Sequence, residues 1–300
     1  MMHSKLSIVI PAYNESASII QVLEEMILFV AEFNIHVLVV NDGSKDDTLQ
    51  RLQQFKINNP NFSLQIISHS QNRGYGGALK SGILHAKTEY VVTMDADGQH
   101  RMEDLPKLYQ RMKLEGADLC IGNRNFKGSS FSRNVIKKMV LYFVRKATGI
   151  EVSDLNSGMK MYKTAIVKSL LKYTPNGMPF SDTIVLLHHQ FRYKIVEEDI
   201  DIRARENGVS TINYKTAIYT IVEVANIIIN FFPFKFFFYI SVLLFVLSII
   251  WGLPLVLIGK GLSTGTSFLL LASLNFFFFG IILENVVRSR FEHYTYVKEP

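Results

Sequence analysis

The stretch Tyr90-Val-Val-Thr-Met-Asp-Ala-Asp-Gly-Gln99 sets an apolar run directly before two carboxylates. The apolar run predicts a buried β-strand. Asp95 and Asp97 follow it, and Gly98 allows a tight turn there. Two carboxylates at a strand end can hold one Mg²⁺ or Mn²⁺ ion while leaving coordination positions open for phosphate oxygens. An isolated Asp-x-Asp pair is weak evidence and is usually just a solvated acidic turn, so the rest of the chain has to decide between the two interpretations.

Apolar runs alternate with helical patterns on both sides of this stretch. Such alternation predicts a mainly parallel sheet with helices on both faces. Ligands of these sheets bind at the carboxyl ends of the strands, and the polar motifs of this chain follow strand ends. The predicted fold class is therefore α/β with a Rossmann-like sheet. The other strands are predicted at residues 6–10, 37–40, 64–68 and 118–122, and the helices at 15–33, 46–55, 77–86, 104–114 and 182–193.

The C-terminal part of the chain is far more apolar. No formal charge occurs in the 24 residues between Lys235 and Lys260, or in the 23 between Lys260 and Glu284. A transmembrane helix needs roughly 20 mostly apolar residues to cross a hydrocarbon core of about 30 Å. A buried hairpin of a soluble protein would keep a polar face, and these stretches offer almost none. Residues 235–300 therefore predict a two-helix transmembrane hairpin with a short tail.

The segment before the hairpin mixes polar and aliphatic residues. Residues 211–234 predict a helix that lies at the membrane interface, and an ordinary amphipathic core helix is the alternative. The predicted organisation is a catalytic domain at 1–210, an interfacial helix at 211–234 and the hairpin at 235–300.

Charge and cysteine content narrow the function further. The net charge is +6, but no basic run alternates with aromatics, which argues against nucleic acid and for an anionic lipid surface. Lys235 and Arg288 flank the outer ends of the two spans, so the catalytic domain and both termini are expected on the cytoplasmic side of the cytoplasmic membrane. No signal peptide is expected before the first strand. The single cysteine, Cys120, falls in a predicted strand and is expected to be inert core.

Four motifs occur in a fixed order along the first hundred residues. They are Pro11-Ala-Tyr-Asn-Glu15, Asn41-Asp-Gly-Ser-Lys-Asp-Asp-Thr48, Asn72-Arg-Gly-Tyr-Gly-Gly-Ala-Leu-Lys80 and Asp95-Ala-Asp-Gly-Gln99. This series resembles the family 2 glycosyltransferases with a GT-A fold, and within them the polyprenyl-phosphate and dolichyl-phosphate hexose synthases. The resemblance covers roughly the first 210 residues, and the two-span tail resembles the membrane-anchored bacterial branch.

The resemblance implies a donor site at these motifs. Asp42 would contact the base or ribose, since a carboxylate can accept a hydrogen bond from a uracil N–H or a ribose hydroxyl. Lys80 follows the glycine-rich turn and would be either a donor contact or a surface lysine. The remaining implied contacts are the nucleotide-pocket residues Pro11, Tyr13, Asn14 and Glu15, and the metal and diphosphate ligands Asp95, Asp97 and Gln99.

Two arginines resemble positions at which the family binds phosphate. Arg124 and Arg133 carry planar guanidinium groups that suit bidentate phosphate binding. Asn123 stands where the family often has serine, which is a mild departure.

Two further positions complete the implied site. Asp154 resembles the acceptor-side aspartate, which would orient the acceptor or stabilise developing positive charge. Arg205 opens a segment that resembles the family's donor-covering loop. Thr211 replaces a lysine that the family usually has there, so part of that loop's charge is missing.

The expected activity is metal-dependent, inverting transfer of a hexose from a nucleotide-sugar to an undecaprenyl-type polyprenyl phosphate in the lipid bilayer. UDP-glucose is the favoured donor, and a homo-oligomer is left open. The alternatives are a transferase with another lipid or glycan acceptor, a processive polysaccharide synthase, and a non-catalytic nucleotide-sugar-binding scaffold. The synthase is disfavoured because its Gln-x-x-Arg-Trp motif is missing and Trp251, the one tryptophan, falls inside a span. The histidines His100, His188 and His189 are not expected to be ligands.

Overall fold

The computed structural model describes residues 5–124, 149–203 and 229–295, with side chains as far as residue 289. The chain divides into two compact units. The first is Met1–Phe131 with Glu151–Thr211, and the second is Ser132–Ile150 with Ile212–Pro300. The domain boundaries predicted at 210/211 and 234/235 stay a prediction. The predicted interfacial helix lies almost entirely outside the described residues.

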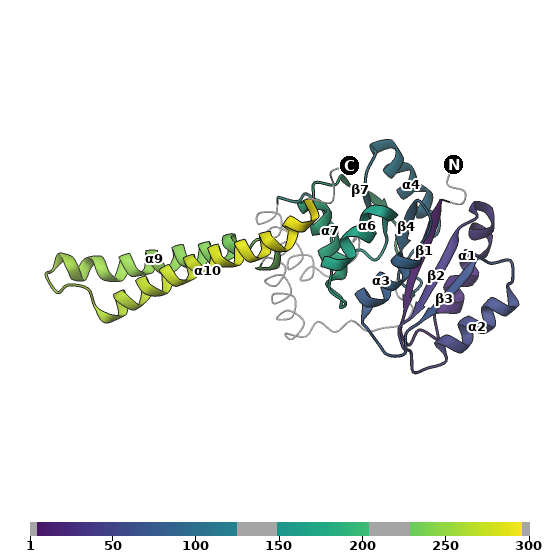
Figure 1. Cartoon of the computed structure of the whole chain (residues 1–300), viewed down its shortest axis with the longest axis horizontal. Coiled ribbons are helices and arrows are strands. Elements are labelled where there is room, and N and C mark those ends of the chain that lie inside the picture. The colour runs from purple at the N-terminus through teal and green to yellow at the C-terminus, as the bar shows by residue number, and fades with distance from the viewer. Residues whose placement is uncertain (1–4, 125–148, 204–228, 296–300) are drawn as a thin grey trace. The chain divides into compact units, whose positions relative to one another are not determined.

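The first unit is built on a seven-stranded sheet of order β3-β2-β1-β4-β6-β5-β7 (Figure 1). Neighbouring strands are parallel except that β6 runs antiparallel to both β4 and β5. The predicted α/β class and mainly parallel sheet are confirmed. The strands are β1 (Leu6–Ala12), β2 (His36–Asn41), β3 (Leu64–Ser68), β4 (Tyr90–Thr93), β5 (Leu119–Arg124), β6 (Lys160–Lys163) and β7 (Ile195–Ile200).

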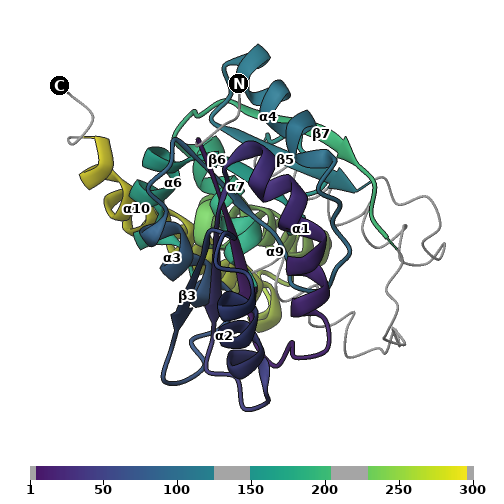
Figure 2. The same cartoon turned by 90° about the vertical axis from the view of Figure 1, so that its right-hand side faces the viewer.

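Helices cover both faces of this sheet (Figures 1 and 2). On one face, alternate β1 residues such as Leu6 and Ile8 join the main core with apolar residues of α1, α2 and α4. On the other face, α3 packs so closely that a Cβ on Gly82 would lie 2.3 Å from Val9. The helices of this unit are α1 (Ile19–Phe33), α2 (Thr48–Asn58), α3 (Tyr75–His85), α4 (Asp104–Glu115), α6 (Thr164–Leu170), α7 (Phe180–Gln190) and the short 3₁₀ helix η1 (Leu171–Tyr173).

Helix α1 begins four residues later than predicted. The backbone N–H groups of Glu15 and Ser16 instead donate to Thr48 Oγ1 and Asp46 Oδ2, at 2.9 and 3.2 Å. Asp46 also accepts from Thr48 N at 3.1 Å, so it serves the start of α2. The loops after β1 and β2 are thereby tied together at the carboxyl edge of the sheet.

Cys120 is fully buried in β5, as predicted. Burial raises the pKa of its thiol to about 12, so the reactive thiolate is not formed at neutral pH.

The second unit contains the predicted hairpin. Helices α9 (Pro233–Leu257) and α10 (Thr264–Thr295) are joined through Gly259 and Gly261, which have φ angles of 76° and 70°. In the described part of the chain, two stretches are long and apolar enough to cross a membrane: Pro233–Leu257 and Thr264–Ser289, with mean hydropathies of 2.6 and 2.1.

Both small residues and phenylalanine pairs, such as Phe237 with Phe276, form the contact between the two helices. A Cβ on Gly252 would lie 2.4 Å from Thr266 Cγ2, and Ser273 Oγ donates to the carbonyl oxygen of Ser241 at 3.0 Å. Small residues of this kind let two helices approach closely where no water drives their association. Many other large side chains of the hairpin are exposed, including Trp251.

Candidate active site

A pocket of about 460 Å³ lies at the carboxyl ends of β1, β2 and β4. This is the edge where an α/β sheet is expected to bind ligands. Its lining includes seven of the residues predicted for the site, which come from three of the four ordered motifs and from β5. The lining residues are Pro11, Ala12, Tyr13, Glu15, Asp42, Asn72, Tyr75, Ala78, Asp95, Ala96, Asp97, Arg124, Asn156, Gly158 and Met178.

Asp42 is buried at the base of this pocket, with 2% of its surface exposed. Its Oδ1 accepts from His69 Nδ1 at 2.6 Å and from Arg73 N at 2.9 Å, while Oδ2 accepts from Gly74 N at 2.8 Å. His69 is held in turn by Ser81 Oγ at 2.8 Å. A carboxylate has about four acceptor positions, so these three bonds leave one for a further donor.

Gly43 makes this arrangement possible. It has a φ of 69°, and a Cβ there would lie 2.6 Å from the backbone carbon of Gln71. The turn after β2 can therefore press against the loop after β3 only because residue 43 is glycine.

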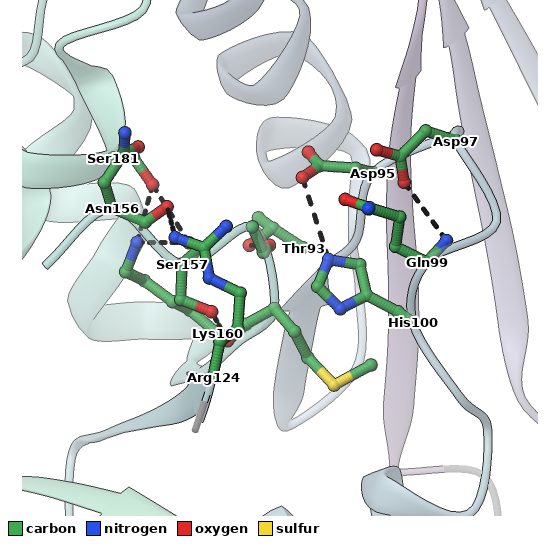
Figure 3. Close-up of polar contacts among 12 residues, drawn as sticks. Thr93, Asp95, Asp97, Gln99, His100, Arg124, Asn156, Ser157, Lys160 and Ser181 are labelled. Atoms are coloured by element: carbon green, nitrogen blue, oxygen red, sulfur yellow. Dashed lines mark hydrogen bonds and ion pairs between the residues drawn. The ribbon is translucent and has the colours of Figure 1, made fainter. Parts of the chain in front are cut away.

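Asp95 and Asp97 sit on the turn after β4 (Figure 3). Tyr75 donates its hydroxyl to Asp95 Oδ1 at 2.9 Å, and His100 Nε2 lies 3.7 Å from Oδ2. Burial opposes ionisation of Asp95, but His100 and Tyr75 outweigh it and hold the pKa of the carboxyl below its usual value. Gly98, with a φ of 72°, provides the predicted tight turn.

Gln99 ties this turn to Arg203, three residues after β7 ends. Its N–H donates to Asp97 Oδ1 at 3.2 Å, its carbonyl accepts from Arg203 N at 3.0 Å, and its amide reaches the Arg203 carbonyl at 3.5 Å. Gln99 is not among the residues that line the pocket. Its metal contact therefore stays a prediction.

Arg124 and Asp154 form a bidentate ion pair at the end of β5. Arg124 Nε and Nη2 donate to Asp154 at 2.8 and 3.1 Å, and Nη2 also donates to the Asn156 carbonyl at 2.7 Å. Burial opposes the charge on Arg124, but Asp154 outweighs it and raises the arginine's pKa. Asp154 is 1% exposed and does not line the pocket. Its link to the pocket is its ion pair with Arg124, which does line it.

Two other predicted donor contacts serve the surrounding loops. Lys80 donates to the Thr174 carbonyl and to Asn176 Oδ1, the latter at 2.9 Å, and burial lowers its pKa. Asn14 Oδ1 accepts from Lys45 N at 2.9 Å. Neither side chain is part of the pocket lining. The other two predicted residues, Arg133 and Arg205, lie outside the described residues.

Several residues near the pocket were not predicted. Tyr75 belongs to the glycine-rich motif, and nothing in the motif's spacing indicates that its hydroxyl reaches Asp95. Asn156 is exposed to the pocket, and Lys160 is fully buried beneath it. His69 could have been found only from its pairing with Asp42. His188 is fully buried, and its Nδ1 lies 2.7 Å from the Ile184 carbonyl oxygen.

Comparison with known sequences places these observations in a family. Residues 7–171 match Glycosyl transferase family 2, and residues 232–288 match the GtrB C-terminal hairpin. The Bacillus subtilis protein described as Putative glycosyltransferase CsbB is 31% identical over 257 residues, covering 84% of this chain and 74% of that protein.

Two other relatives are named for their acceptors. A Dolichyl-phosphate beta-glucosyltransferase of Saccharomyces cerevisiae is 31% identical over 64% of this chain. An Undecaprenyl-phosphate 4-deoxy-4-formamido-L-arabinose transferase of Proteus mirabilis is 29% identical over 70% of it. The chain spans only 65% and 64% of the lengths of these two relatives.

A solved structure confirms the type of fold. Glucosyl-3-phosphoglycerate synthase from Mycobacterium tuberculosis superposes with a TM-score of 0.56 at 19% identity, covering 74% of this chain and 79% of that one. The same enzyme has been crystallised with Mn²⁺ and UDP-glucose and with Mg²⁺ and UDP. The family match over residues 7–171 agrees with the motif series and with the GT-A type of sheet. The chain therefore belongs to glycosyl transferase family 2 and carries a hairpin of the GtrB type.

Proposed function

We propose that this chain transfers a hexose from a nucleotide-sugar to a polyprenyl phosphate at the cytoplasmic face of a membrane. UDP-glucose is the favoured donor, and an undecaprenyl-type phosphate is the favoured acceptor. The observation that carries the proposal is a single pocket lined by Asp42, Asp95, Asp97 and Arg124 in a chain that also has a GtrB-type hairpin. The names of the yeast and Proteus relatives support a polyprenyl-type acceptor, and the yeast name supports glucose.

The β1 and β2 end of the pocket suits the nucleotide. The Asp42 carboxylate keeps one acceptor position for a uracil N–H or a ribose hydroxyl. Its other acceptor positions are taken by hydrogen bonds within the protein. Tyr13, which is 41% exposed on the lining, offers an aromatic face to a base. The carboxylate that would recognise the nucleotide is therefore already fixed in place by the protein.

The β4 end of the pocket suits a divalent cation. The described residues contain no group of three or more His, Cys, Asp or Glu side chains that could enclose a metal ion. Asp95 and Asp97 provide two carboxylates on one turn, which fits Mg²⁺ or Mn²⁺ bound through few protein ligands, with phosphate oxygens and water as the rest. Such a cation, when bound, neutralises charge on the leaving diphosphate.

The β5 end suits the acceptor phosphate. Arg124 presents a guanidinium to the pocket, and Asp154 fixes its orientation. A phosphate monoester has a second pKa of about 6, so at neutral pH it is largely a dianion and needs little help from a general base. Its oxygen would bond to the anomeric carbon as the bond to the diphosphate breaks. A single displacement of this kind inverts the anomeric centre.

A transfer assay tests the proposal. The full-length chain in lipid vesicles would be given undecaprenyl phosphate, Mg²⁺ or Mn²⁺, and a panel of nucleotide-sugars. We expect a glycosyl phospholipid from UDP-glucose with the inverted anomeric configuration by NMR. Nucleotide-sugar binding without transfer to any polyprenyl phosphate would favour the non-catalytic scaffold, and transfer to another lipid or glycan would identify a different acceptor.

Membrane orientation has its own test. In a chain whose Cys120 is replaced by Ser, Ser263→Cys should react with a membrane-impermeant thiol reagent from outside intact cells. Ser4→Cys should stay protected because both termini are proposed to be cytoplasmic. The opposite labelling pattern would invert the proposed topology.

A further inference from the structure

Lys160 is an unusual residue beside the active site. Among the residues that the structure describes, it is the one buried lysine, and none of its surface is exposed. Lys160 lies in β6 directly opposite Thr93 of β4, and Thr93 precedes Asp95 by two residues. Lysine is almost never fully buried unless its charge is compensated. Burial lowers the pKa of Lys160 to about 8, and nearby carboxylates, Asp182 foremost, partly offset that effect.

The ammonium group of Lys160 is directed at one backbone carbonyl (Figure 3). Its Nζ lies 2.5 Å from the Ser157 carbonyl oxygen and 2.5 Å from Ser181 Oγ. Ser181 Oγ also donates to the Ser157 carbonyl, at 3.1 Å. Two side chains from different elements, β6 and α7, therefore fix the same carbonyl oxygen.

The next residue, Gly158, touches the carboxylate of Asp95. A Cβ on Gly158 would lie 2.0 Å from Asp95 Oδ2, so only glycine lets the backbone come this close. The Gly158 carbonyl accepts from Thr93 Oγ1 at 3.0 Å, which holds the backbone on its other side. The 157–158 backbone thus blocks one direction in which the Asp95 carboxylate could turn.

We propose that Lys160 is a positioning residue for the divalent-cation site, because it fixes the 157–158 backbone against Asp95 and so sets the orientation of that carboxylate. The Tyr75 hydroxyl on Oδ1 and the Gly158 backbone at Oδ2 restrain Asp95 from two sides. Lys160 is not among the residues that line the pocket. Its effect passes through Ser157 and Gly158. This inference rests on the metal-dependent function proposed above.

Electrostatics alone predicts the opposite effect on metal binding. Asp95 is among the carboxylates whose charge favours the ammonium form of Lys160. Removing that positive charge would, by Coulomb's law, strengthen the binding of a cation at Asp95. Removing a support for the 157–158 backbone would weaken it. The sign of the change therefore separates the two effects.

The test measures Mn²⁺ binding to the full-length chain in the presence of UDP, by the loss of the free-Mn²⁺ EPR signal. Lys160→Met keeps a long, flexible side chain but removes the donor. We expect its Mn²⁺ affinity to fall about 10- to 100-fold, the range for partners that orient metal ligands. Lys163→Met is the matched control, because Lys163 lies on the same strand, is 38% exposed and pairs with Asp118. Its Mn²⁺ affinity should be unchanged.

Two further variants keep the proposal testable if Lys160→Met does not fold. Ser181→Ala removes one of the two side-chain donors to the Ser157 carbonyl and should weaken Mn²⁺ binding less than Lys160→Met. Gly158→Ala places a methyl group directly against the Asp95 carboxylate. It should weaken Mn²⁺ binding at least as much as Lys160→Met does. Folded variants that bind Mn²⁺ within twofold of the wild type, or more tightly, would overturn the proposal.

The outcomes also separate this inference from the proposed function. A wild-type chain that binds Mn²⁺ with UDP but forms no glycosyl phospholipid contradicts the proposed acceptor and leaves the role of Lys160 standing. Normal transfer together with unchanged Mn²⁺ affinity in every variant overturns the role of Lys160 alone. A wild-type chain that binds no Mn²⁺ with UDP overturns both.

Discussion

The carboxylates of Asp42 and Asp95 line the same pocket but are held in different ways. Asp42 has a side chain only 3% exposed and accepts hydrogen bonds from an imidazole and two backbone N–H groups. The side chain of Asp95 is 32% exposed and accepts one hydroxyl hydrogen bond, with His100 at 3.7 Å. The first carboxylate mainly organises the protein around it, and the second is left available to a ligand.

The two ends of the pocket also differ in what supports them. The β2 end is fixed by hydrogen bonds from backbone N–H groups of the loop after β3 to the carboxylate of Asp42. The β4 and β5 end is fixed by charged side chains, namely the Arg124–Asp154 pair and Lys160. Substitutions at the first end should therefore act on nucleotide binding, and those at the second on turnover and metal binding.

The largest expected effect is at the β4 end of the pocket, where a divalent cation is proposed to bind. Asp97→Asn removes one of two carboxylates on the turn after β4, so we expect transfer to fall by at least about 100-fold, as when one group that stabilises developing charge is lost. The thermal unfolding temperature should stay close to that of the wild type. Asp47→Asn is the control, since that carboxylate is exposed outside the pocket. Near-normal turnover of Asp97→Asn at saturating Mg²⁺ or Mn²⁺ would contradict the proposed role of Asp97 in binding the metal.

The second effect concerns pH and belongs to Lys160. Its pKa is about 8 in the folded chain against an ordinary value of 10.5, which corresponds to about 3 kcal/mol. Between these pH values the unfolded chain holds the proton and the folded chain has released it, so raising the pH should stabilise the folded state.

The measurement is the pH dependence of the unfolding free energy, taken as the difference between wild type and Lys160→Met. That difference should move in favour of the wild type by about 3 kcal/mol from pH 8 to pH 10.5. Other lysines and tyrosines titrate in both chains and cancel. A difference that does not vary with pH would show that Lys160 keeps an ordinary pKa.

A smaller effect is expected at the β2 end of the pocket, where the nucleotide is proposed to bind. Asp42→Asn replaces one acceptor oxygen with an NH₂ group that faces a donor, and a buried donor left without a partner costs about 1–3 kcal/mol. The 73–74 backbone should loosen, so the KM for the nucleotide-sugar should rise while kcat changes little. A loss confined to kcat would mean that Asp42 acts on the chemical step instead.

The smallest effect should come from Tyr75→Phe. This change removes the hydroxyl that donates to Asp95 Oδ1, and a hydrogen bond to a charged group is worth about 1.5 kcal/mol, or roughly tenfold. We expect Mn²⁺ affinity with UDP to fall by that amount and the KM for the nucleotide-sugar to change less. Equal changes in both quantities would erase the distinction between the two ends of the pocket.

Much of the fold could be predicted from the sequence because its main signals are local. Strands β1 to β5 are apolar runs that end at polar motifs, and each was placed to within a few residues. Strands β6 and β7 were missed. Lys160–Lys163 begins and ends with lysine, and Ile195–Ile200 carries three consecutive acidic residues, so neither has the pattern of a buried strand. Their places in the sheet depend on neighbours distant in sequence.

The residues of the candidate site also divide into those that local sequence signals predict and those that depend on distant partners. Residues that follow strand ends, such as Asp42 and Asp95, reach the pocket because topology alone brings them there. Lys160 could not be predicted, because its burial depends on Ser181 of α7 and on a carbonyl three residues before it. Lys80 and Asn14 bond to distant loops instead of lining the pocket, and sequence spacing does not reveal such partners.

The position of β6 between β4 and β5 fixes an order in which the site can be assembled. Strand β5 pairs with β6 and β7 and has no hydrogen-bonded contact with β4. During synthesis the four strands β1 to β4 can pair as soon as they emerge, because each has a neighbour made earlier or next to it. Arg124 joins the sheet only after the chain has been extended past Lys163. The Asp42 side of the pocket can therefore form before Arg124 takes its place, and the Arg124 side is completed only by pairings with strands from the later part of the chain.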